Sequence, residues 1–253
     1  VTVKDVTAPV FSNMPANITV NAQLNNCNQL VSWTAPNTSD NCGVADVHSS
    51  DSFFDNFGFT LLPVGVHTIT YTATDVNGNI TTQSFTVTVE DNQPPVINNC
   101  PANISVNATQ GTCGATVIYQ QPTAGDNCSA MGVTLAINNT NYLPGNVFPV
   151  GVHTVTYTAT DAAGLTATCT FTITVVDNIP PTVTCPANIT VSTAAGLCTA
   201  VVTYPLPVVS DNCGGTVGVV YDIPSGSTFN KGTTTVTATA TDAAGNTATC
   251  IFT

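Results

Sequence analysis

Apolar and polar residues alternate along most of the chain, and the pattern is clearest between residues 157 and 176. Two runs, Tyr157 to Thr160 and Phe171 to Val175, carry an apolar side chain at every second position, as a half-buried strand does. Between them, Asp161 can bond its own backbone and Gly164 can adopt a left-handed conformation. We therefore predict a β-hairpin with one face in a core and a Thr-rich face in water.

Close copies of this hairpin recur in the other two thirds of the chain and set its period. The acids of the linkers, Asp5, Asp91 and Asp177, are 86 residues apart in both steps. A solenoid repeat has roughly 20 to 50 residues, whereas a β-sandwich has about 100. The period predicts three β-sandwich domains, at residues 4–89, 90–175 and 176–253, with little helix. A first strand is expected after each Pro-Ala, at Asn17–Asn21, Asn103–Asn107 and Asn188–Ser192.

The two ends of the sequence match the inside of a repeat. Residues 1–3 (VTV) match residues 87–89, the tail of a last strand, and Thr253 matches the residue just before that tail. The last strand of the third domain is therefore truncated. Two origins fit: neighbouring repeats of one long chain, or separate copies joined head to tail, in which residues 1–3 of one copy complete the sheet of the next by strand addition.

Charge is scarce and almost entirely negative. Charged residues are 6% of the chain, the only basic ones are Lys4 and Lys231, and the net charge is -12. Such a surface cannot neutralise phosphates, which excludes nucleic acid and anionic membranes as partners. No apolar run reaches the roughly 18 residues of a membrane span, so we expect no membrane insertion. The natural small partner is a cation.

The ten regularly spaced cysteines predict disulfides and an oxidising compartment, hence a secreted or cell-surface protein. The first repeat has Met14 and Gln83 where the others have cysteine, so two positions are lost together. This predicts the long-range pairs Cys100–Cys169 and Cys185–Cys250. The short pairs Cys27–Cys42, Cys113–Cys128 and Cys198–Cys213 then remain. Because bridged Cα atoms lie within about 7 Å and a strand advances about 3.3 Å per residue, each short pair requires the chain to fold back.

Three segments together resemble the hyalin-repeat family: DNIPPTVTCPANITV from Asp177, DNCG from Asp211, and GTTTVTATATDAAGNTATCIFT from Gly232. The resemblance covers essentially the whole chain, three times. It implies an all-β fold of three tandem immunoglobulin-like β-sandwich domains in a linear array. It also implies an extracellular or bacterial surface protein associated with adhesion, and no catalysis.

Nine of the fourteen acids fall at three repeating positions, which we name the linker set (Asp5, Asp91, Asp177), the DNC set (Asp40, Asp126, Asp211) and the hairpin set (Asp75, Asp161, Asp242). In an immunoglobulin-like sandwich the last hairpin turn lies at the end where the chain enters. We therefore expect the linker and hairpin acids to meet at each junction and to bind Ca²⁺, a cation that takes six to eight oxygen ligands. The DN-x-P-P linker is also similar to the calcium-binding junction of cadherins. The alternative is that each Asp only caps its own turn. The DNC set fits either end of a repeat.

A loop unique to the first repeat carries Phe53, Phe54, Phe57 and Phe59. Its aromatic side chains can pack into the core, or form an exposed contact with a neighbouring repeat, a glycan or a protein. We find no catalytic motif in the chain.

The function expected from these observations is a structural and adhesive extracellular protein that forms a rigid fibre, stalk or filament. The alternatives are a glycan-binding or protein-binding surface adhesin, and non-catalytic repeats of a secreted enzyme.

Overall fold

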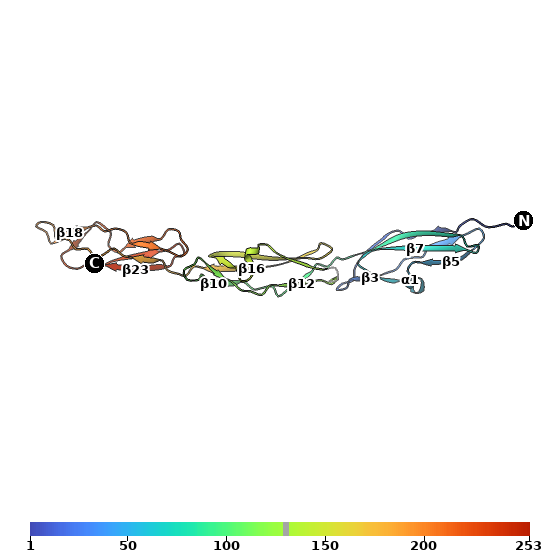
Figure 1. Cartoon of the computed structure of the whole chain (residues 1–253), viewed down its shortest axis with the longest axis horizontal. Helices are drawn as coiled ribbons and strands as arrows, with labels where there is room; N and C mark the ends of the chain where they lie inside the picture. The colour runs from blue at the N-terminus through green and yellow to red at the C-terminus, as the bar shows by residue number, and fades with distance from the viewer. Residues whose placement is uncertain (129–131) are drawn as a thin grey trace. The chain divides into compact units, whose positions relative to one another are not determined.

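The computed structural model describes residues 1–128 and 132–253, and its regular elements are almost all β-strands (Figure 1). The chain forms two compact units. One comprises residues 1–98, 123–136 and 158–168, and the other residues 99–122, 137–157 and 169–253. We call residues 4–89, 90–175 and 176–253 repeats 1, 2 and 3, the join of repeats 1 and 2 joint 1, and the join of repeats 2 and 3 joint 2.

Repeat 1 is a two-layered β-sandwich. Its strands are β1 (Val10–Ser12), β2 (Ile18–Asn21), β3 (Asn28–Val31), β4 (Asn37–Ser39), β5 (Val44–Ser49), β6 (Thr60–Pro63), β7 (Gly65–Asp75) and β8 (Ile80–Glu90). One layer is the sheet β2-β8-β7-β5, and the other contains the pairs β1-β4 and β3-β6. The long hairpin of β7 and β8 dominates the first layer (Figure 1).

The core of repeat 1 follows the alternation in its sequence. Along β7, Ile69, Tyr71 and Ala73 are buried, while the threonines between them are only half-buried. They pack against Phe11 of β1 and Leu62 of β6, which face them from the other layer. The predicted all-β sandwich is therefore confirmed in this repeat.

The loop of phenylalanines contains a helix, α1 (Ser52–Phe57), that the sequence pattern did not predict. Asp51 caps its N-terminus by accepting hydrogen bonds from the backbone of Phe53 and Phe54, and Gly58 ends it in a left-handed conformation with φ of 75°. Six residues are too few for a helical period to be recognised. Among the described residues, no helix has the length and apolarity needed to cross a membrane.

Repeat 2 contains the predicted hairpin. Its elements are β9 (Val96–Asn98), β10 (Ile104–Asn107), β11 (Gly114–Thr116), β12 (Thr123–Gly125), β13 (Thr134–Ile137), the 3-10 helix η2 (Thr140–Tyr142), β14 (Val147–Pro149), β15 (Gly151–Thr160) and β16 (Thr166–Val176). Strands β15 and β16 are neighbours in the sheet β10-β16-β15-β13. Gly164, at the turn between them, has φ of 86°, as expected.

In repeats 1 and 2 the first predicted strand pairs with the end of the last strand. Ile18 of β2 lies opposite Val87 of β8, and Ile104 of β10 lies opposite Ile173 of β16, both in parallel registers of four residues. The pairing adds a strand to the edge of the main sheet and covers the apolar side chains at the end of the last strand.

Repeat 3 lacks this parallel pair, and the strand predicted at Asn188–Ser192 does not form. Its strands are β17 (Thr182–Thr184), β18 (Thr199–Val202), β19 (Val208–Ser210), β20 (Gly218–Tyr221), β21 (Ser227–Asn230), β22 (Val236–Thr241) and β23 (Thr247–Phe252). In repeats 1 and 2 this segment pairs with Val87–Glu90 and Ile173–Val176, and the residues that the structure describes end at Thr253, which corresponds to Thr172. One bond of the expected ladder remains, from the Ile189 amide to the Thr253 carbonyl at 2.8 Å.

Two of the predicted disulfides are present. Cys100 is bonded to Cys169 and Cys185 to Cys250, each linking the start of a repeat to its last strand. Cross-linking a loop of this length stabilises a fold by about 4 kcal/mol on a chain-entropy estimate. These bonds close repeats 2 and 3. They agree with the prediction drawn from repeat 1, where Met14 and Gln83 replace both cysteines of the pair.

The predicted short pairs Cys27–Cys42, Cys113–Cys128 and Cys198–Cys213 are wrong. Cys27 is instead bonded to Cys128 and Cys113 to Cys213, with Cα atoms 4.8 and 4.5 Å apart, so both bonds cross a joint. Cys42 and Cys198 are exposed and unbonded.

The error has a simple geometric cause, which is seen best in repeat 1. Cys42 follows β4 and lies near Asp5, where the repeat begins, because its neighbour Asn41 donates to that carboxylate. Cys27 precedes β3 at the other end, where Gln93 of the next linker contacts the adjoining loop. The chain therefore travels the length of the repeat between the two cysteines and does not fold back.

Candidate metal centre at the repeat joints

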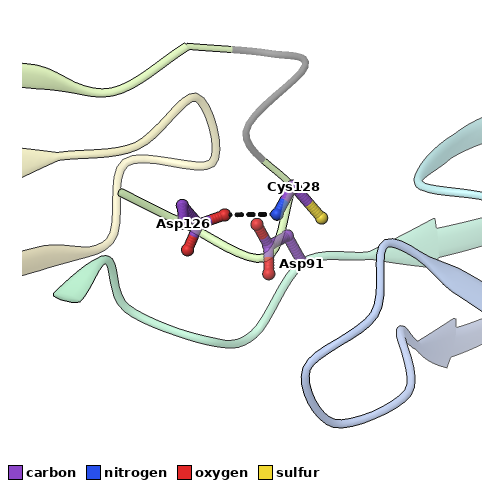
Figure 2. A group of neighbouring side chains, drawn as sticks. All are labelled: Asp91, Asp126 and Cys128. Carbon is purple, nitrogen blue, oxygen red and sulfur yellow. Dashed lines mark hydrogen bonds between the residues drawn. The ribbon is translucent and has the colours of Figure 1, made fainter. Parts of the chain in front are cut away.

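Carboxylates gather where each repeat begins. In repeat 1, Asp5, Asp40 and Asp75 each place an oxygen within 4.8 Å of the other two. In repeat 2, Asp91 and Asp126 approach in the same way, and in repeat 3 so do Asp177 and Asp211. Figure 2 shows the carboxylates of Asp91 and Asp126 turned towards each other. We call the sets Asp5/Asp40/Asp75, Asp91/Asp126/Asp161 and Asp177/Asp211/Asp242 acid clusters 1, 2 and 3.

The sulfur of Cys128 lies within the same 4.8 Å group in cluster 2, and that of Cys213 in cluster 3. Both sulfurs are bonded to a cysteine of the preceding repeat. A metal binds the thiolate form of cysteine, so these sulfurs are not available as ligands. The donor atoms of the clusters are therefore oxygens.

The acids of the DNC set belong to the clusters, whereas the sequence alone did not decide at which end of a repeat they lie. The predicted meeting of linker and hairpin acids is found directly in cluster 1, where Asp5 and Asp75 share the 4.8 Å group. In cluster 3, Asn246 donates both to the Asp177 carbonyl and to Asp242, so those two residues are neighbours. The hairpin acid Asp161 is buried, but it lies outside the 4.8 Å group of Asp91 and Asp126.

Each acid uses one carboxylate oxygen to hold its own turn. In the DNC turns, Asp40, Asp126 and Asp211 accept the amide of the cysteine two residues on, at 2.7 to 2.9 Å. In the hairpin turns, Asp161 accepts the Leu165 amide at 2.8 Å, and Asp75 accepts the Asn79 amide at the same distance. Turn capping, the alternative expected from the sequence, therefore occurs, and it occupies only one oxygen of each DNC acid and of Asp161.

The second oxygen of four of these acids is buried without a hydrogen-bond partner. The atoms are Asp40 Oδ2, Asp126 Oδ1, Asp161 Oδ2 and Asp211 Oδ1. A buried carboxylate oxygen with no donor costs several kcal/mol, and native structures leave few such groups unpaired. A bound cation would satisfy these oxygens, so the residues present fit a metal with oxygen ligands.

Cluster 2 has the strongest need for a cation. In clusters 1 and 3 the second oxygen of the hairpin acid is satisfied, because Asn79 donates to Asp75 at 2.7 Å and Asn246 donates to Asp242 at 2.9 Å. Repeat 2 has Leu165 at this position, which offers no donor. Asp161 is only 8% exposed and its Oδ2 has no hydrogen-bond partner, and the same is true of Oδ1 of Asp126 in the same repeat.

The clusters carry negative charge that no basic side chain balances. Among the described residues the only ion pair joins His48 to Asp46, outside the clusters. The hydrogen bond from the Thr7 backbone holds the pKa of Asp5 below its ordinary value. Burial raises the pKa of Asp75, but hydrogen bonds from Asn79 and Asn77 more than offset this and lower it. Asp5 and Asp75 are therefore ionised at neutral pH.

The other two residues of the DNC motif fasten one repeat to the next. At joint 1, Asn127 donates to the Asn26 carbonyl at 3.2 Å, beside the Cys27–Cys128 bond. At joint 2, Asn212 donates to the Thr112 carbonyl at 2.9 Å, beside the Cys113–Cys213 bond. Asp, Asn and Cys thus act together: the acid lines the cluster, and the other two residues bind the preceding repeat.

The phenylalanine loop divides between the core and the surface. Phe54 is buried and stacks on Trp33, with ring centroids 4.0 Å apart. Phe53, Phe57 and Phe59 are exposed and form a group with centroids 4.6 to 6.2 Å apart. We call these three the aromatic patch.

A comparison with protein families decides the family of the chain. The HYR domain profile matches three times, at residues 4–89, 90–175 and 176–253. The chain belongs to the HYR domain family. Acid clusters 2 and 3 and the cross-repeat disulfides therefore lie at the joints between tandem HYR domains, and acid cluster 1 lies where the first domain begins.

The curated relatives of these HYR domains include two hyalins. Hyalin of Lytechinus variegatus is 38% identical over 98% of this chain and 47% of its own length. Hyalin of Strongylocentrotus purpuratus is 36% identical over 96% of this chain and 20% of its own length. A serine-rich adhesin for platelets of Staphylococcus aureus is 35% identical over 45% of this chain and 9% of its own length. The chain thus spans about half the length of one hyalin and less of the other relatives.

Proposed function

We propose that the chain is a structural and adhesive extracellular protein whose HYR repeats are fixed end to end by Ca²⁺ and disulfides at their joints. The observation that carries this proposal is the set of buried, unpaired carboxylate oxygens at the acid clusters. Two of them, on Asp126 and Asp211, lie two residues before the cysteines that bond one repeat to the next. A joint with both features resists bending and extension, which is what a fibre or stalk requires.

Calcium is the cation that suits these ligands best. The donors are carboxylate oxygens, and Ca²⁺ accepts six to eight oxygens in a flexible geometry, including backbone carbonyls and waters. Zn²⁺ prefers cysteine and histidine, and the cysteine sulfurs within the groups of clusters 2 and 3 are in disulfides. Mg²⁺ demands a near-ideal octahedron and keeps most of its waters. In the bound state the cation would neutralise carboxylates that come from the linker, the DNC turn and the hairpin turn of one repeat.

An extracellular location is supported by the disulfides and the family. Disulfides persist in oxidising environments and are rare in the cytosol. The relatives that cover nearly the whole chain are hyalins, and another is named as an adhesin. A chain of this kind acts through its surface and its mechanical continuity, so we propose that it has no catalytic role and that its partners are neighbouring repeats or further copies of itself.

Calorimetric titration of Ca²⁺ into the oxidised full chain tests the proposal. We expect binding at the acid clusters, and loss of the cluster 2 site in Asp126→Asn, because the amide removes the charge and puts a donor where an unpaired oxygen stood. Asp46→Asn is the matched control: it removes an exposed acid that pairs only with His48. Equal calcium binding by both variants and the wild type would refute a metal site at cluster 2.

A glycan-binding or protein-binding adhesin is a second candidate, and the aromatic patch favours it. Phe53, Phe57 and Phe59 are 48%, 60% and 38% exposed, although no other repeat has such a group. Exposed aromatic groups of this kind are common at binding surfaces. We expect the variant with all three changed to serine to lose binding on a glycan array while its melting temperature stays within a few degrees, because Phe54 keeps its place on Trp33.

The control for this variant is Val66→Ser, which removes an exposed apolar side chain elsewhere in repeat 1. Wild-type protein that binds no glycan on the array, or a triple variant that binds as well as the wild type, would remove glycan recognition by the patch.

A further inference from the structure

Repeat 2 contains an open pocket of about 510 Å³ beside the 3-10 helix η2. Its walls come from the connection between β13 and β14, from β14 itself and from the start of β15. Three asparagines and two rings carry the polar groups that line it: Asn139, Asn141, Asn146, Tyr142 and His153. The volume falls within the range of roughly 300 to 1,000 Å³ that small-molecule sites occupy.

Hydrogen bonds and stacking within repeat 2 hold the pocket in shape without a ligand. The Asn139 side chain accepts the Asn141 amide at 2.9 Å and so caps η2. The hydroxyl of Tyr119 donates to the Tyr142 carbonyl. The ring of Tyr142 stacks on that of Phe148, which is 0% exposed. The pocket is therefore preorganised, which reduces the entropy that a ligand loses on binding.

The same hydrogen bonds leave a defined set of donors and acceptors for a ligand. Asn139 uses its side-chain oxygen in the cap, so its amino group remains as a donor. Asn146 donates its amino group to the Thr140 carbonyl at 3.1 Å, so its side-chain oxygen remains as an acceptor. His153 donates from Nε2 to the Pro149 carbonyl at 2.7 Å, so Nδ1 of the neutral ring remains as an acceptor.

Two further groups of the pocket have no hydrogen-bond partner among the residues that the structure describes. They are the side-chain amide of Asn141 and the hydroxyl of Tyr142, and each can both donate and accept. The pocket thus presents donors and acceptors side by side. It suits a ligand whose own polar groups do both, as the hydroxyls of a sugar do.

The pocket also lacks the charges that would select an ionic ligand. None of the described residues that line it is an acid, a lysine or an arginine. A charged ligand would lose hydration here without gaining an ion pair, and the net charge of -12 repels anions. The rings of Tyr142 and His153, with centroids 5.6 Å apart, offer flat surface to the C–H groups of a sugar ring. Rings and uncharged amides together favour a neutral sugar.

The position of the pocket supports a role in recognition, because the repeats differ there. The connection leads from the strand beside the last hairpin to a strand of the other layer, at residues 50–59, 138–146 and 222–226 of repeats 1, 2 and 3. It contains α1 in repeat 1, η2 in repeat 2 and only bends and a turn in repeat 3. Binding residues often lie on variable loops that a rigid scaffold positions.

We propose that this pocket binds a neutral sugar residue of an extracellular glycan. The sugar ring packs against Tyr142, and its hydroxyls form hydrogen bonds with the three asparagine side chains. The site goes beyond the calcium joints, because its ligand is neither a cation nor another repeat. It shares a class of ligand with the aromatic patch, but the patch belongs to repeat 1 and the pocket to repeat 2.

Nuclear magnetic resonance of the isotope-labelled, oxidised full chain tests the proposal in solution, because a single sugar residue binds too weakly to survive the washing of an array. The probes are the methyl glycosides of glucose, galactose, mannose and N-acetylglucosamine. We expect at least one of them to shift the side-chain amide signals of Asn139, Asn141 and Asn146, with a Kd on the order of 1 mM. If no glycoside shifts these signals at concentrations well above that Kd, the proposal is wrong.

Two variants of Asn141 show whether the pocket is the site. Its side chain is exposed and makes no hydrogen bond to the described residues, so both variants should fold normally. Asn141→Ala should raise the Kd about tenfold, because the sugar loses a hydrogen bond. Asn141→Trp should abolish binding, because the indole fills the pocket. Asn98→Ala, which removes an exposed asparagine of β9, is the matched control and should bind like the wild type.

The same titration separates the pocket from the other two sites. The variant with all three phenylalanines of the aromatic patch changed to serine should bind the glycoside like the wild type. Calcium binding by Asn141→Trp should also be unchanged, because the acids of cluster 2 are intact. Glycoside binding that persists in Asn141→Trp, or that is lost in the serine variant, would overturn the pocket while leaving the calcium joints in place.

Discussion

Saturating calcium should raise the free energy of unfolding of the oxidised chain above its value in EDTA. A ligand that binds only the folded state stabilises it by about 2.7 kcal/mol when its free concentration is 100 times its Kd, for each independent site. The reason is local: calcium supplies the partner that Asp126 Oδ1 and Asp161 Oδ2 lack. Denaturant unfolding in calcium and in EDTA, at a protein concentration where the chain is monomeric, measures the difference.

Leu165→Asn is an informative variant for this experiment. Asparagine stands at the equivalent positions 79 and 246, where its side chain donates to the hairpin acid. The substitution should give Asp161 a hydrogen-bond donor and stabilise the chain in EDTA more than in calcium. The difference between the free energies of unfolding in calcium and in EDTA should therefore become smaller. Identical unfolding of the wild type in calcium and in EDTA would contradict cation binding at the clusters.

The second large effect concerns the cross-repeat disulfide of joint 1. Cys27→Ser combined with Cys128→Ser opens a loop of about 100 residues, for which the chain-entropy estimate is about 4.7 kcal/mol. We expect the free energy of unfolding to fall by about that amount. We also expect the melting of repeats 1 and 2, followed by calorimetry, to separate into two transitions as their coupling is lost.

The matched control is Cys42→Ser combined with Cys198→Ser, which removes two thiols and no disulfide of the single copy. Exposed substitutions of this kind usually change stability by less than about 0.5 kcal/mol. The single variants distinguish the two pairings. If Cys42→Ser alone lowers the free energy of unfolding as much as Cys27→Ser alone, these two cysteines are bonded to each other within repeat 1.

The parts of the fold that depend on nearby residues could be predicted from the sequence. Alternation in β7 and β15 identifies the buried face of each long strand, because the side-chain period of a strand is two wherever one face is covered. The turn of Asp161 and Gly164 requires a capping acid and a left-handed residue that few other side chains provide. The simultaneous absence of two cysteines from repeat 1 identified the long-range disulfides of repeats 2 and 3.

The disulfides of the joints could not be predicted, because the sequence is periodic. A cysteine of the Cys27 type has two equivalent partners, one in its own repeat and one in the next, and comparison of the repeats cannot separate them. Only the length of the intervening strands distinguishes the two partners. Those strands carry the chain from one end of the repeat to the other, so the cysteine of the same repeat is too far away. For the same reason the DNC acids could not be assigned to an end of the repeat, although Asn127 and Cys128 contact the preceding repeat.

The absent strand at Asn188–Ser192 shows a different limit. Its sequence is nearly that of β2 and β10, yet it is not a strand, because strand formation depends on a partner, and the residues that pair with β2 and β10 have no equivalents among the described residues of repeat 3. Helix α1 was missed because its signals are only the caps Asp51 and Gly58 around six residues. In both cases the alternation of apolar and polar residues in the segment itself is not enough to predict its secondary structure.

The central claim is that each joint is bonded across two repeats, and a mass-spectrometric disulfide map of the unreduced chain tests it most directly. Digestion with proteases that cut between all ten cysteines should release linked peptides containing Cys27 with Cys128 and Cys113 with Cys213. Peptides linking Cys27 to Cys42 and Cys113 to Cys128 would contradict the account, because each bond would then lie within one repeat.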